Sequence, residues 1–123
     1  MISLETAQAL KDAGLGWNPH AGDYYYRVYD QGFGHYDKYP QLVDGKNYID
    51  FMANNVYHAL SLSQLLAEIE ARGYVWALRH SGSYEISICP WGDISKTKTF
   101  KAKSPDEAAA QALLWIIEQE KGE

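Results

Sequence analysis

The chain has 123 residues, of which 46% are hydrophobic and 22% charged, and its formal net charge is -5. These values exclude a disordered chain and are typical of one globular domain, so we expect a single domain over residues 1–123. Neither half of the chain is basic: residues 1–60 carry four basic and seven acidic side chains, and residues 61–123 carry seven and nine. Because nucleic-acid binding depends largely on phosphate neutralisation, we expect no nucleic-acid partner.

The sequence also bears on the cellular compartment. Cys89 is the only cysteine, which excludes an internal disulfide and a cysteine-based zinc site. The first ten residues lack the basic and apolar regions of a signal peptide. The longest apolar stretch, residues 112–117, is too short to span a bilayer. We therefore expect a cytoplasmic protein with no membrane partner.

The first predicted element is a helix that begins after Ser3 as N-cap and ends at Gly14. Next, the segment YYYRVYD over residues 24–30 is rich in aromatic residues and predicts a strand. Two short apolar segments then flank Asp44 and Gly45, a pair that strongly predicts a hairpin turn.

A second helix is predicted over residues 61–73. Ser61 and Gln64 have the spacing of a capping box, and Gly73 stands where a left-handed C-cap is expected. The segments YVWALRH and YEISICP follow, and they flank Ser81-Gly82-Ser83 as the two arms of a hairpin. In the second arm Tyr84, Ile86 and Ile88 alternate with polar residues, so one face of the arm is expected to be buried.

The last strand is predicted in KTKTFKAK, residues 96–103, whose four lysines are typical of an edge strand protected against further pairing. The closing helix begins with Ser104 as N-cap and Pro105 at its first position. Hairpins dominate this order. The predicted fold class is therefore α+β, with an antiparallel sheet of about five to six strands packed against three helices in the order α-β(ββ)-α-βββ-α.

The three helical segments together resemble small uncharacterised proteins carried by phages and prophages. Those proteins share a T-x-x-x-L-x-x-A-G opening, an S-L-S-Q-L-L type of helix and a closing S-P-E-E-A-x-A-x-A-L-L-W type of helix. The matching positions here are Thr6, Leu10, Ala13 and Gly14, then residues 61–66, then residues 104–115. The resemblance implies a phage or mobile-element setting and no particular activity.

The tyrosine-rich segment is the main candidate for a binding surface. In an extended strand Tyr24, Tyr26 and Val28 share one face, and Tyr25, Arg27 and Tyr29 share the other. If Val28 marks the inner face, the second set is exposed. Tyrosine and arginine are enriched in interface hot spots, so we expect a non-catalytic protein-binding or assembly module, including self-association as a homodimer. The candidate residues are Tyr25, Arg27, Tyr29, Tyr36 and Tyr39.

Two alternatives stay open at this point. The loop over residues 31–41 could fold over the tyrosine face and bury it. A small enzyme or enzyme inhibitor could instead use an acid–histidine pair near His35 and Asp37. No catalytic motif is present, and the four histidines lack the spacing of metal ligands. We therefore name no catalytic residue, no metal ligand and no cofactor.

Overall fold

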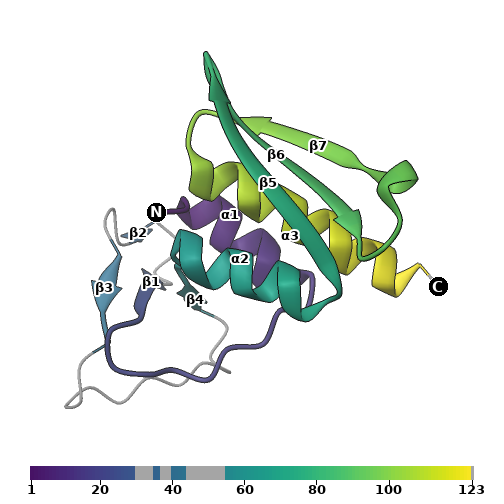
Figure 1. The fold of residues 1–123 in the computed structure, drawn as a ribbon. Coiled ribbons are helices and arrows are strands. Elements are labelled where there is room, and N and C mark those ends of the chain that lie inside the picture. Colours follow the sequence, from purple (N-terminus) through teal and green to yellow (C-terminus); the bar gives the residue numbers. More distant parts are fainter. Residues whose placement is uncertain (30–34, 37–39, 44–54, 123) are drawn as a thin grey trace. The chain divides into compact units, whose positions relative to one another are not determined.

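The computed structural model describes residues 1–29, 35–36, 40–43 and 55–122 (Figure 1). It confirms the α+β class, the antiparallel pairing and the predicted order of helices and strands. The strands lie in two separate antiparallel sheets. The chain divides into two compact units, one formed by residues 3–60 and the other by residues 61–123 together with Met1 and Ile2.

In the first unit, helix α1 (Leu4–Asp12) begins and ends as its sequence predicts. The Ser3 hydroxyl accepts a hydrogen bond from the Thr6 N–H at 3.2 Å. At the other end Gly14 has a φ of 105°. The N–H of Gly14 donates to the Lys11 carbonyl and the N–H of Leu15 donates to the Leu10 carbonyl, at 2.9 and 3.1 Å. These two bonds form a Schellman closure.

The sheet of the first unit is built around β1 (Tyr24–Tyr29), which confirms the predicted strand. Along one edge β1 pairs with β4 (Val56–His58), and the Val28 N–H extends this contact by donating to the Asn55 carbonyl at 2.9 Å. Strands β3 (Gln41–Leu42) and β2 (His35–Tyr36) also pair with β1. Because Tyr25 pairs with both Gln41 and His58, β3 and β4 lie along opposite edges of β1. The predicted Asp44–Gly45 turn lies outside the described residues.

In the second unit, α2 (Leu62–Ala71) has the predicted capping box. The Ser61 N–H donates to Oε1 of Gln64 at 2.8 Å, and the Gln64 N–H donates to Oγ of Ser61 at 3.2 Å. Gly73 follows the helix with a φ of 85°. Helix α3 (Pro105–Lys121) has Ser104 as its N-cap and Pro105 as its first residue, as predicted.

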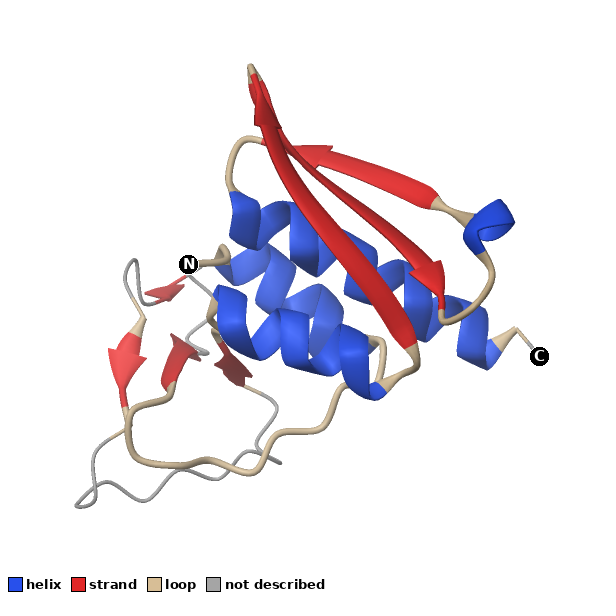
Figure 2. Cartoon of the chain, viewed as in Figure 1, coloured by secondary structure: helices blue, strands red, loops and turns tan. Residues whose placement is uncertain are grey.

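The sheet of the second unit has the order β5-β6-β7, formed by β5 (Tyr74–Ser81), β6 (Ser83–Pro90) and β7 (Lys98–Ala102). The predicted hairpin between β5 and β6 is confirmed and turns at Gly82, with a φ of 75°. Helices α2 and α3 pack on one face of this sheet (Figures 1 and 2). Ile86 and Ile88 point to that face and are fully buried. The lysine-bearing β7 lies at the sheet edge, as predicted.

Among the described helices, none combines the length and the hydropathy that crossing a membrane requires.

Candidate functional site

The tyrosine surface predicted from the sequence is not an exposed face at Tyr25. The Tyr25 side chain is 6% exposed and belongs to a core cluster with Val43 and Val56, against which Trp17 packs. Tyr26, on the opposite face of β1, is also 6% exposed. The expectation that Tyr25 stands in solvent is therefore wrong. The physical reason is that β1 is a central strand and apolar residues from the neighbouring chain segments cover the Tyr25 face.

The other members of that predicted surface are only partly described. Arg27 is half-buried, and its guanidinium carbon lies 5.6 Å from the centre of the Tyr25 ring. Tyr24, assigned to the inner face, is 36% exposed. The side chains of Tyr29, His35 and Tyr36, and the positions of Asp37 and Tyr39, lie outside what the structure describes.

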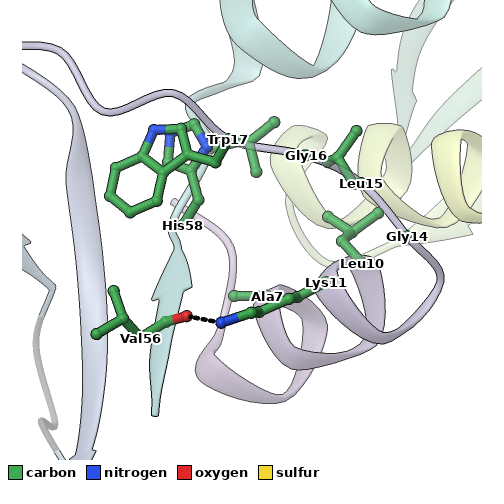
Figure 3. A pocket seen from close by; sticks show the side chains of 10 residues that line it. Ala7, Leu10, Lys11, Gly14, Leu15, Gly16, Trp17, Val56 and His58 are labelled. Atoms are coloured by element: carbon green, nitrogen blue, oxygen red, sulfur yellow. Dashed lines mark hydrogen bonds between the residues drawn. The ribbon is translucent and has the colours of Figure 1, made fainter. Parts of the chain in front are cut away.

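The first unit contains a cavity of about 290 Å³ between α1, the loop after it and β4 (Figure 3). Its walls are mostly apolar. Trp17 and His58 stack with ring centroids 4.4 Å apart and an angle of 11° between the rings. Trp17 is further held by a 3.0 Å hydrogen bond from its indole N–H to Oδ2 of Asp23. Asp23 accepts a second bond from the His20 N–H, as expected of an aspartate at a turn.

The Lys11 side chain supplies a polar group to this cavity. Nζ of Lys11 donates to the Val56 carbonyl at 2.7 Å and lies 5.1 Å from the centre of the Tyr57 ring. Lys11 and His58 are the two lining residues of this cavity, among those described, with ionisable side chains. The described lining of this cavity is thus mainly apolar.

A second cleft, in the second unit, has a volume of about 610 Å³ and is open to solvent. We call it the tryptophan cleft. Trp76 and Trp91 are its largest side chains and are 36% and 81% exposed. The indole N–H of Trp76 donates to Oε1 of Glu70 at 2.8 Å. The lining residues are Glu70, Gly73, Tyr74, Val75, Trp76 and Trp91.

Trp91 is exposed because the backbone holds it at the corner of a turn. The Asp93 N–H donates to the Pro90 carbonyl at 3.0 Å, and Gly92 has a φ of 83°. Glycine is favoured at this third position of a turn when φ is positive. The Trp91 N–H also donates to the Gly73 carbonyl at 2.9 Å, which ties the turn to the end of α2. The backbone at Trp91 is therefore held in place.

Ile94 extends the apolar surface on the same segment. It lies in the short helix η1 (Ile94–Lys96) directly after the turn and is 84% exposed. Ser95 donates to the Asp93 side chain, and the Thr97 hydroxyl donates to the Ile94 carbonyl at 2.6 Å, so the segment is held by its own side chains. Exposed apolar patches, in contrast to single exposed residues, often mark a binding site.

Sequence reasoning missed the tryptophan cleft. The predicted strand YEISICP ends at Pro90, and no role is predicted for Trp91 or Ile94 in the following residues. A signal was present, because a turn that carries both a tryptophan and an isoleucine has little opportunity to bury them. In the described part of the chain, no three His, Cys, Asp or Glu side chains gather in a way that could hold a metal ion.

Comparisons with protein-family models, curated proteins and solved structures found no match to this chain. The resemblance of the helical segments to phage and prophage proteins therefore stays a prediction. Any assignment of function depends on the geometry of the chain itself.

Proposed function

We propose that this protein is a non-catalytic binding module and that it engages a basic segment of another protein through the tryptophan cleft and Ile94. The observation that carries the proposal is the exposure of Trp91, at 81%, on a turn that hydrogen bonds hold in place. Tryptophan is among the residues most enriched in interface hot spots. The proposal retains the class of function expected from the sequence and moves the surface away from Tyr25.

The free energy available at this surface supports binding. An indole buries about 200 Å² when it is covered. At about 25 cal/mol per Å², the exposed fraction of Trp91 alone corresponds to roughly 4 kcal/mol of transfer free energy that the isolated chain does not gain. A partner that covers Trp91, Trp76 and Ile94 can use this energy to offset the entropy lost on association.

The charge of the protein favours a basic partner. The formal net charge is -5, and charge complementarity steers association toward partners of opposite sign. Among the described residues that line the cleft, Glu70 carries a negative charge. A second candidate, an acid–histidine site near His35 and Asp37, falls on side chains outside the described residues, and we do not propose it.

The test uses a peptide-display library selected on the purified protein, followed by affinity measurements on the selected sequences. We expect the selected peptides to be basic and to bind Trp91→Ser at least about 30-fold more weakly, the effect of a hot-spot residue. Leu42→Ser is the matched control, since Leu42 is 48% exposed but lies in the other unit. Selected peptides that bind Trp91→Ser as well as the native chain, or a selection that yields no binder, would refute the proposal.

A further inference from the structure

The tryptophan cleft combines aromatic walls with one carboxylate. Trp76 and Trp91 supply two indoles, and Glu70 supplies the acid. The 2.8 Å bond from the Trp76 indole N–H fixes Oε1 of Glu70 beside the ring. A carboxylate has two oxygens and about four acceptor positions, so one indole bond leaves it able to accept further donors. Among the described lining residues there is no cationic side chain.

The surroundings of Glu70 are negative. Glu70 lies in the last turn of α2, where the helix macrodipole places partial negative charge, and this turn contains no basic residue. Arg72, which follows the helix, is already paired with Glu68 and lies with its Nε 3.6 Å from Glu120. Arg72 is thus shared by two carboxylates, and neither of these ion pairs places a cation at Glu70.

We propose that the tryptophan cleft is a cation site that takes one basic side chain of the partner, with its guanidinium or ammonium group against the indoles of Trp76 and Trp91 and with Glu70 as counter-ion. A cation over the face of an indole is attracted by the ring quadrupole, and this attraction is strongest for tryptophan. The volume of about 610 Å³ lies within the range of small-ligand sites. This inference rests on the proposed function and specifies the chemistry that the cleft recognises.

The test follows the indole N–H signals of the four tryptophans by two-dimensional NMR. The probe is N-acetyl-arginine amide, and its neutral counterpart is N-acetyl-citrulline amide, which has nearly the same shape. We expect the arginine compound to shift the signals of Trp76 and Trp91 with a dissociation constant on the order of 1 mM. Trp17 lies in the other unit, and its signal should stay in place.

Two variants distinguish the effect of the Glu70 carboxylate on arginine binding from the effect of the net charge of the protein. Glu70→Gln keeps the size of the side chain and the acceptor for the Trp76 indole, and it should weaken arginine binding about tenfold. Glu5→Gln removes the same charge from an exposed position on α1 and should leave the affinity unchanged. Equal shifts from the arginine and citrulline compounds, or a Glu70→Gln protein that binds as tightly as the native chain, overturn the cation site.

The result also distinguishes this inference from the broader proposal. If display peptides bind through Trp91 but the arginine compound shifts neither indole, the cation site fails and the binding module stands. If neither the peptides nor the arginine compound binds, both fail. Concentration-dependent self-association of the native chain that Trp91→Ser abolishes would make a second copy the occupant, and it too would overturn the basic partner.

Discussion

Two isoleucines in the second unit, Ile86 and Ile94, test which side chains belong to the core and which are available to a partner. Ile86 is 0% exposed and pairs across the sheet with Leu78 and Phe100, whereas Ile94 is 84% exposed. Replacement of either by alanine removes the same three carbon atoms. Only the site differs, so the two variants form a matched pair.

The expected cost at Ile86 follows from its burial. Three buried carbons correspond to about 2.4 kcal/mol of transfer free energy, at about 0.8 kcal/mol each. A residual cavity of roughly 40 Å³ adds about 1 kcal/mol at 24 cal/mol per Å³. We therefore expect Ile86→Ala to lower the free energy of unfolding by about 3.5 kcal/mol. Ile94→Ala should change it by less than about 0.5 kcal/mol, as at ordinary surface positions.

The assay is equilibrium unfolding in urea, followed by far-UV circular dichroism for the native chain and both variants. The slope of the free energy against urea concentration should be the same for all three proteins, since they expose nearly the same surface on unfolding. The reasoning is refuted if Ile94→Ala is as destabilising as Ile86→Ala, because Ile94 would then be part of a core and unavailable to a partner.

Three further predictions can be checked with the same urea assay. Tyr25→Ser should lower the free energy of unfolding by about 3 kcal/mol, since this side chain is in the core cluster. A decrease below about 1 kcal/mol would indicate that Tyr25 is exposed after all. Gly73→Ala should lower the free energy of unfolding by about 1–2 kcal/mol, because alanine is strained at a φ of 85°. A steric clash does not contribute, since nothing lies within 4 Å of an added Cβ. Gly16→Ala, where the added Cβ is equally unhindered and φ is not in that range, should be close to neutral, and equal losses would contradict the backbone explanation. Ser61→Ala should cost about 1 kcal/mol by removing the cap of α2, and Ser63→Ala, inside the same helix and exposed, should not; no difference between these two would contradict the role of the cap.

The parts of the fold that the sequence predicts are those specified by neighbours along the chain. A capping box depends on two side chains three residues apart, and Ser61 with Gln64 forms it as expected. A left-handed glycine ends a helix through bonds within six residues, as at Gly14. The alternation that predicts burial of Ile86 is likewise local. Such features need no knowledge of the tertiary contacts.

The candidate site was harder to predict because its residues meet only in the folded chain. Whether Tyr25 or Tyr24 faces the core depends on Val43 and Val56, which come from other segments and which no period-two pattern identifies. Trp76 and Trp91 are separated along the sequence by nearly the whole β5–β6 hairpin. They come together because the register of that hairpin places Trp91 beside Gly73.

Gly73 lies where the end of α2, the start of β5 and the lining of the tryptophan cleft meet. Its left-handed conformation ends α2, and its carbonyl accepts the N–H of Trp91. Opening of the last turn of α2 therefore releases the backbone of the Trp91 turn as well. Local opening of this kind sets the rate at which amide protons exchange with solvent, and a ligand that binds only the closed form slows it by mass action. Occupancy of the cleft should thus be recorded as slower exchange at the Trp91 amide and in the last turn of α2, including Glu68 and Ala71, which do not line the cleft.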